Sequence, residues 1–284
     1  MLQPCHPDRT KPLRYYQEIA LNRAVQAILQ GRQRSLLTLC TGAGKTAIAF
    51  QVCWKLWSAG WNTKQTARKP KILFLADRNV LVDDPMAKDF RPFGDARHKI
   101  AEGQAVKSRD IYFALYQTMA GDENRPGLYR EYPHDFFDLV IVDECHRGSA
   151  RDGSNWRNIL EWFAPAIQLG MTATPLREDN RDTYEYFGAP IYGYSLAQGI
   201  ADGFLAPYRV HRVITDYDAV GWRPRAGELD RYGRTIPDRE YTTQDFERVV
   251  TLRQRTQAIA RHLTDFLKHT DRFAKTIVFC VDPH

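Results

Sequence analysis

Short apolar runs that are rich in branched residues recur along the chain, each followed by a polar or helical stretch. The runs cover residues 35–40, 71–76, 110–115, 138–142, 167–171 and 276–281. Because the apolar residues are continuous rather than alternating, each run predicts a strand that is covered on both faces. Such strands are typical of a parallel sheet between helices, so the pattern predicts an α/β architecture.

Apolar residues at helical spacing predict two helices packed on the sheet, over residues 16–30 and 46–58. Near the end of the chain, Thr242 and Asp245 resemble a helix-opening box, and an apolar face predicts a helix running to about His269. The last apolar run then predicts another buried strand.

The alternation of apolar runs and helical stretches is interrupted between about residues 209 and 240, where glycine and proline occur among many charged residues. We therefore predict a domain over residues 1–208, a connector over 209–241 and the truncated start of a second domain over 242–284. One helix and one strand cannot bury a core of their own. The last segment is therefore either the opening of a second domain or an element adopted by the first, and we interpret the chain as a fragment of a larger protein.

Composition favours a cytoplasmic protein without a membrane segment. The hydrophobic share of 43% and charged share of 26% are ordinary for a soluble globular chain, and the N-terminus lacks the apolar stretch of a secretory signal. The five cysteines are dispersed, which predicts reduced thiols rather than a zinc site. A net charge of +6 mildly favours a polyanionic partner.

The strongest chemical signal follows the first apolar run and precedes a predicted helix. It reads Thr41, Gly42, Ala43, Gly44, Lys45, Thr46. Free amide groups of such a loop and the helix start form a nest for nucleotide phosphates. Lys45 is expected to reach the β and γ phosphates of ATP, and the Thr46 hydroxyl to bind Mg²⁺. The full pattern expects glycine at position 39, where this chain has Leu39, so a glycine-rich turn without a ligand is the alternative.

Two adjacent carboxylates, Asp143 and Glu144, follow the apolar run 138–142. Ligands of α/β sheets bind at the carboxyl ends of strands, so the pair suits a metal ligand followed by a base. We expect Asp143 to hold Mg²⁺ and Glu144 to orient and deprotonate the attacking water. The sequence Thr172-Ala173-Thr174-Pro175 after run 167–171 could hydrogen-bond this pair, or it is an ordinary strand-ending turn.

The order of these motifs resembles superfamily 2 helicases and translocases, with GAGKT, a DEAH-type box and TATP. More narrowly, the chain resembles the motor region of the R subunit of type I restriction-modification enzymes. The matching stretches are LRYYQ (13–17), TGAGKT, ILFLADRNVLVDD (72–84), LYQTM (115–119), FDLVIVDECHRG (137–148), GMTATP, YGYSLAQGIADGFLAPY (192–208) and TIVFC (276–280). The resemblance implies a RecA-like P-loop NTPase domain, with a mostly parallel sheet flanked by helices, and the beginning of a second RecA-like domain.

The resemblance also implies roles for further residues. Gln17, helped by Arg14, matches the position that reads adenine, because an amide can pair with the edge of that base. Arg78, Gln117 and Thr118 match positions that touch the nucleic-acid backbone, which gives contact without sequence reading.

A third implied role is the coupling of hydrolysis to movement, which falls to His146, Thr172 and Thr174. The implied function is that of an ATP-driven translocase on double-stranded DNA, assembled with specificity and methyltransferase subunits. Two alternatives stay open: a strand-separating DNA or RNA helicase, and a non-catalytic nucleotide-binding interaction module.

The chain departs from the resembling subunit in two respects. It contains no Glu-x-Lys or Gln-x-Lys tripeptide of the subunit's nuclease, so we expect no DNA cleavage. It also lacks the second motor domain, whose arginines reach the γ-phosphate. Because such an arginine contributes roughly 10³ to 10⁵ in rate, the isolated chain is expected to hydrolyse ATP very slowly.

Overall fold

The chain divides into two compact units, Met1–Pro207 and Tyr208–His284, in a computed structural model. The structure describes residues 4–7, 12–101, 105–121, 127–145, 155–173, 181–229, 234–242 and 253–279. Within these ranges, no helix combines the length and apolarity needed to cross a lipid bilayer.

Unit 1 contains a seven-stranded sheet in which neighbouring strands run parallel. In chain order the strands are β1 (Arg34–Leu39), β2 (Ile72–Ala76), β3 (Arg97–Lys99), β4 (Ile111–Leu115), β5 (Leu139–Asp143), β6 (Ile167–Thr172) and β7 (Tyr192–Tyr194). In space they follow the order β3-β4-β2-β5-β6-β1-β7. The predicted α/β architecture with a mostly parallel sheet is confirmed.

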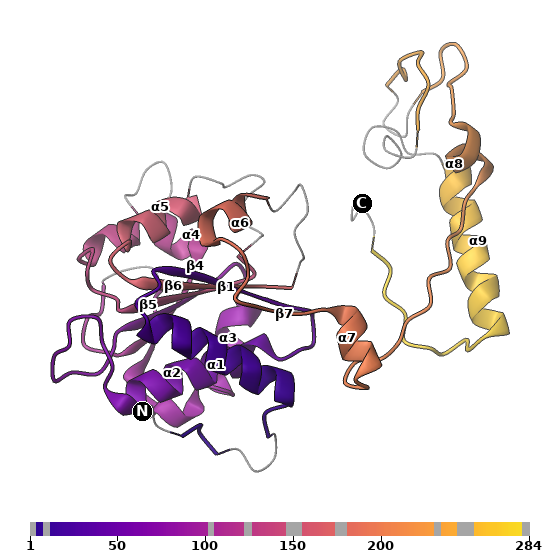
Figure 1. The fold of residues 1–284 in the computed structure, drawn as a ribbon. Coiled ribbons are helices and arrows are strands. Elements are labelled where there is room, and N and C mark those ends of the chain that lie inside the picture. The colour runs from indigo at the N-terminus through magenta and orange to yellow at the C-terminus, as the bar shows by residue number, and fades with distance from the viewer. Residues whose placement is uncertain are drawn as a thin grey trace. The chain divides into compact units, whose positions relative to one another are not determined.

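Helices cover both faces of this sheet (Figure 1). The helices of unit 1 are α1 (Tyr15–Leu29), α2 (Lys45–Ala59), α3 (Val80–Ala87), α4 (Tyr116–Ala120), α5 (Asn155–Trp162), α6 (Arg181–Phe187) and α7 (Leu196–Ala201), with 3-10 turns η1 (Arg91–Ala96) and η2 (Leu128–Glu131). Helices α1 and α2 lie on one face, and α4, α5 and α6 lie on the other. The helices predicted over 16–30 and 46–58 correspond to α1 and α2.

Two hydrophobic cores explain why the strand sequences are continuously apolar. In β2, Ile72 and Phe74 enter the core under α1 and α2, whereas Leu73 and Leu75 enter the core under α4 and α5. All four side chains are buried. Successive residues of a strand point to opposite faces, so a strand between two helical layers needs an apolar residue at every position.

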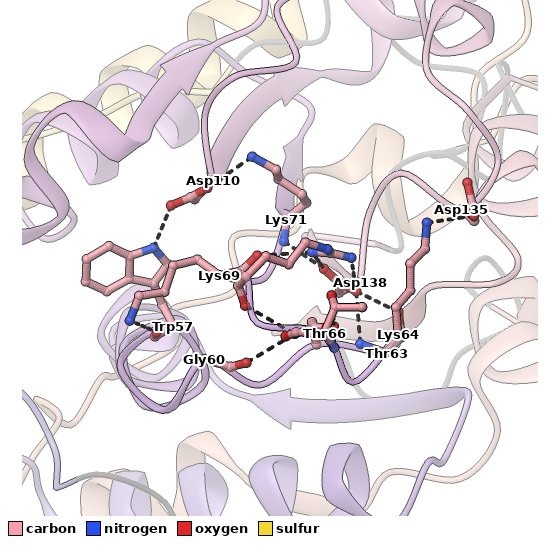
Figure 2. Close-up of polar contacts among 12 residues, drawn as sticks. Trp57, Gly60, Thr63, Lys64, Thr66, Lys69, Lys71, Asp110, Asp135 and Asp138 are labelled. Atoms are coloured by element: carbon pink, nitrogen blue, oxygen red, sulfur yellow. Dashed lines mark hydrogen bonds and ion pairs between the residues drawn. The ribbon is translucent and has the colours of Figure 1, made fainter.

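The buried carboxylate of Asp138 lies just before β5, at the amino end of that strand, and binds groups from the preceding loop (Figure 2). Its oxygens accept hydrogen bonds from the backbone and hydroxyl of Thr63, from the backbone of Lys71 and from both terminal nitrogens of Arg68, at 2.6–3.0 Å. Burial alone would raise the pKa of Asp138, but the hydrogen bonds from Arg68, Thr63 and Lys71 lower it below its usual value. The carboxylate thereby fastens the loop between α2 and β2 to the start of β5.

Unit 2 is poor in buried side chains. Its described helices are α8 (Asp216–Val220) and α9 (Arg253–His269), and two isolated antiparallel bridges, Trp222↔Tyr241 and Leu229↔Thr235, lie in the region predicted as a connector. The predicted division into a domain, a connector and the start of a second domain stays a prediction.

The buried strand predicted at the end of the chain is wrong over residues 276–279. These residues form no strand, and the apolar side chains of Ile277, Val278 and Phe279 are exposed. A strand gains its hydrogen bonds and its burial from a neighbouring strand, so an apolar sequence alone does not produce one. The rest of the predicted strand lies outside the described residues.

Candidate active site

The described loop after β1 and the acidic pair after β5 lie at the same end of the sheet, because the carboxyl ends of parallel strands lie together. Strand β6 lies between β1 and β5, so the loop after β1 and the acidic pair at the end of β5 flank the same strand. The register pairs Asp143 with Met171, and Thr172 with Thr38. Residues about a hundred positions apart in the chain thereby become neighbours.

The loop between β1 and α2 has the backbone geometry of a phosphate nest. Gly42 and Gly44 have φ angles of 82° and 81°, a conformation that favours glycine, and no side chain caps the start of α2 at Lys45. The first amide groups of an α-helix have no acceptor within the helix and, with the helix dipole, attract anions. Of the remaining loop residues, Thr41 is exposed and Ala43 is buried.

Lys45 and Glu144 connect this loop to the acidic pair. The Nζ atom of Lys45 lies 3.1 Å from Oε1 of Glu144, and the two side chains are only 10% and 16% exposed. Glu144 has a φ angle of 50°, rare for a residue with a side chain, and its backbone N–H donates to Oδ1 of Asp143 at 3.0 Å. Unusual backbone geometry of this kind is frequent where a side chain must be aimed for function.

Asp143 is buried and electrostatically strained. Its side chain is 3% exposed, and burial, with the nearby carboxylate of Glu144, raises the pKa from 3.8 to about 6 although Lys45 opposes the rise. A divalent cation would favour the ionised carboxylate, so the residue suits a metal ligand. Thr46 at the start of α2 is half-buried, and its hydroxyl oxygen is also a suitable ligand for Mg²⁺.

Gln17 links helix α1 to the same loop. Its Nε2 donates to the carbonyl oxygen of Ala43 at 2.8 Å, and its Oε1 accepts from the backbone N–H of Arg14 at 2.9 Å. A methyl group on Gly44 would lie 2.4 Å from Nε2 of Gln17 and would displace that side chain, and the φ angle of 81° separately favours glycine here. The two residues predicted to read adenine therefore lie beside the predicted phosphate loop.

The residues predicted to contact nucleic acid form a neighbouring group, at the ends of β2 and β4. Arg78 is exposed and its Nε lies 3.6 Å from the carboxylate of Asp77. Gln117 is also exposed and donates from Nε2 to the carbonyl oxygen of Asp77 at 3.3 Å, while Thr118 is half-buried. Both strand ends are thus joined through Asp77, which sequence reasoning missed.

The coupling residues are only partly described. Thr172 is buried at the end of β6, whereas His146 and Thr174 lie outside the described residues.

Tyr116, which sequence reasoning also missed, is buried beneath the acidic pair, with its hydroxyl 3.5 Å from the carbonyl oxygen of Asp143. Burial, with the nearby Cys145 and Asp143, raises the pKa of Tyr116 well above its usual value, so the hydroxyl stays protonated. The sequence signal that could have identified Tyr116 as a site residue is its position next to Gln117, directly after a strand.

Comparisons with known proteins agree with the motif order. A family model described as type III restriction enzyme, res subunit, matches residues 10–177. The type I restriction enzyme EcoAI endonuclease subunit of Escherichia coli is 47% identical over 272 residues, which cover 96% of this chain and 33% of that protein. The EcoKI endonuclease subunit of Escherichia coli strain K12 is 30% identical, over 95% of this chain and 25% of that protein.

A solved structure has the same fold. It is described as a fragment of an HsdR subunit of a type I restriction enzyme from Vibrio vulnificus YJ016, with 58% identity and a TM-score of 0.74 over 98% of this chain and 44% of that one. The predicted resemblance to the R-subunit motor region and the RecA-like fold class are confirmed. The chain spans about a third or less of the two curated relatives it matches.

Proposed function

The chain belongs to the family described as type III restriction enzyme, res subunit, and from that premise we propose that it is the ATP-binding and ATP-hydrolysing motor module of a double-stranded DNA translocase, within the R subunit of a type I restriction endonuclease. The observation that carries the proposal is the 3.1 Å contact between Lys45 and Glu144. It brings a cation suited to phosphate and a carboxylate suited to activating water to one place.

In this proposal the phosphates of ATP lie on the loop that ends at Thr46, and Lys45 turns from Glu144 to the β and γ phosphates. When bound, Mg²⁺ neutralises charge on those phosphates, with Thr46 and Asp143 as its protein-side partners. Glu144, freed from the ion pair, orients the attacking water and accepts its proton. Thr172, with His146 and Thr174, conveys the state of the acidic pair to the rest of the motor.

Contact with DNA falls to the exposed residues Arg78 and Gln117 with Thr118, whose side chains or backbone would hold phosphates without reading bases. Specificity and methyltransferase subunits are the proposed protein partners, and the cytoplasm the proposed location. The absence of both nuclease tripeptides from the sequence supports a chain that does not cleave DNA.

An ATP titration by calorimetry, with and without Mg²⁺, tests the nucleotide site. Wild-type chain is expected to bind in a Mg²⁺-dependent manner, and Lys45→Ala to lose at least about tenfold in affinity, because a charge-assisted contact contributes on the order of 1.5–3 kcal/mol. Binding that Lys45→Ala leaves unchanged would favour the non-catalytic interaction module instead.

Hydrolysis is tested separately with Glu144→Gln. The amide keeps the shape of the side chain but cannot accept the proton, so ATP affinity should persist while residual phosphate release disappears. Phosphate release equal to that of the wild type would show that another group is the base. Displacement of one strand from an oligonucleotide duplex would favour the strand-separating helicase over the translocase.

A further inference from the structure

Two tyrosines hold the segment after β7 against the start of helix α1. The hydroxyls of Tyr15 and Tyr194 both donate to Oδ2 of Asp202, the Tyr194 bond measuring 2.7 Å. The ring of Tyr16 stacks on that of Tyr194, with centroids 3.9 Å apart and planes 8° from parallel. Helix α7 and the turn after it (Figure 1) are therefore fastened to the helical turn that also carries Gln17.

The turn after α7 brings two apolar side chains to the predicted nucleotide site. The backbone N–H groups of Phe204 and Leu205 both donate to the carbonyl oxygen of Gly199, at 3.0 and 2.9 Å. Leu205 lies against the phosphate loop, since a methyl group added to Gly42 would be 3.2 Å from its Cδ2. A methyl group on Gly199 would lie 2.5 Å from Cδ1 of Leu205, so the side chain of Leu205 packs closely against the backbone of Gly199.

Phe204 contacts Arg14. The guanidinium carbon of Arg14 lies 4.7 Å from the centre of the Phe204 ring, within the range of a cation–π interaction. A second contact fixes the same group, because Nη1 donates to the hydroxyl of Tyr16 at 3.1 Å. A guanidinium held at one face and at one nitrogen has lost most of its rotational freedom before any ligand arrives, which reduces the entropic cost of binding.

We propose that residues 199–205 form a wall of the nucleotide site, and that Phe204 is a positioning residue that holds Arg14 ready for the adenine base. The inference rests on the proposed function. The placement follows from the contacts: the phosphate loop touches Leu205 on one side and Gln17 on the other, and Gln17 in turn bonds the backbone of Arg14. The base end of a nucleotide whose phosphates occupy the loop then lies toward Arg14 and Phe204.

In this role Phe204 affects the binding of the adenine base and not the binding of the phosphates. The two effects can be measured separately in the full chain. Calorimetry should compare the affinity for ATP with that for inorganic triphosphate, both with Mg²⁺. Phe204→Leu is expected to weaken ATP about tenfold and to leave inorganic triphosphate unchanged, because the phosphate loop keeps its geometry. Phe204→Tyr, which keeps the aromatic ring, should restore ATP affinity to within about twofold.

Two further variants guard against a folding artefact. Asp202→Ala releases both tyrosines without touching Arg14 or Phe204 and should show the same selective loss of ATP affinity. Leu196→Ala, an exposed position on α7, is the matched control and should bind both ligands as the wild type does. Thermal melts of each variant check that the fold persists.

Equal weakening of ATP and inorganic triphosphate in Phe204→Leu would overturn the inference, since it would show that the segment only supports the loop. Unchanged ATP affinity in both Phe204→Leu and Asp202→Ala would overturn it as well. In either case, ATP binding that still depends on Lys45 would leave the proposed function standing. If the wild-type chain binds no ATP, the proposed function and the inference fail together.

Discussion

At the scale of single residues, Asp143 shows how a proposed functional role and stability oppose each other. The carboxylate is buried, and its raised pKa means that the ionised form is unfavourable in the folded chain without a cation. Lys45 lowers the pKa of Asp143 only in part, and its Nζ atom lies against Oε1 of Glu144. A residue that lowers stability while the site is empty is expected where a charge must be ready to meet a metal ion.

We therefore predict that Asp143→Asn stabilises the nucleotide-free chain at pH 7.5, by roughly 2–3 kcal/mol in the free energy of unfolding. The folded pKa of about 6 lies above the unfolded value, so the wild type loses stability as the pH rises from about 4 to 6. The advantage of the variant should consequently be present above pH 7 and vanish near pH 4. Urea denaturation at several pH values measures it, and a destabilised variant at pH 7.5 would contradict the argument.

At the scale of elements, strand β5 has a buried aspartate at each end, and the two serve different purposes. Asp143 ends the strand beside the loop that we propose binds phosphates, whereas Asp138 precedes the strand at its amino end, where the carboxylate accepts five hydrogen bonds from three residues. The pKa of Asp138 is lowered and that of Asp143 is raised, because donors outweigh burial at one end and not at the other. The same residue type therefore contributes to stability with opposite sign.

Asp138→Asn is accordingly predicted to destabilise the chain at pH 7, by about 3 kcal/mol, because the amide cannot accept every bond and leaves Arg68 without its charged partner. The folded pKa is below the unfolded one, so this contribution is present above about pH 4 and is lost as the pH falls further.

Asp135→Asn is the matched control for this prediction. Its carboxylate pairs with Lys64 in the same region, but the two side chains are 59% and 43% exposed. An exposed ion pair contributes little, so the change in the free energy of unfolding should stay within about 0.5 kcal/mol. Denaturation curves that shift equally for both variants would show that Asp138 has no special structural role.

At the scale of the whole molecule, the two units differ in how they are stabilised. Both hydrophobic cores lie in unit 1, whereas Pro224, Ile236 and Tyr241 are the buried apolar residues of unit 2 within its described ranges. Large apolar side chains of unit 2, such as Phe273 and Phe279, are exposed. Folding free energy comes chiefly from buried apolar area, so unit 1 holds nearly all of it.

A chain ending at Pro207 is therefore predicted to unfold cooperatively, with a melting temperature within about 3 °C of the 284-residue chain. It should also keep ATP affinity within about twofold, because every residue proposed to contact the nucleotide precedes the cut. Circular dichroism melts and calorimetry measure the two quantities. A broad, non-cooperative melt would mean that unit 2 contributes to the core of unit 1.

The sequence by itself determined the layered α/β fold and the glycine turn between β1 and α2, where we propose that phosphates bind. A continuously apolar strand must be covered on both faces, and glycines before a helix permit a left-handed backbone. Both features therefore depend only on residues that are close together in the sequence. Only the tertiary structure decided which distant residues meet: Lys45 with Glu144, Asp138 with Arg68, Phe204 with Arg14. It also decided that Ile277, Val278 and Phe279 of the last apolar run stay exposed, because burial and pairing depend on a partner that a local pattern cannot supply.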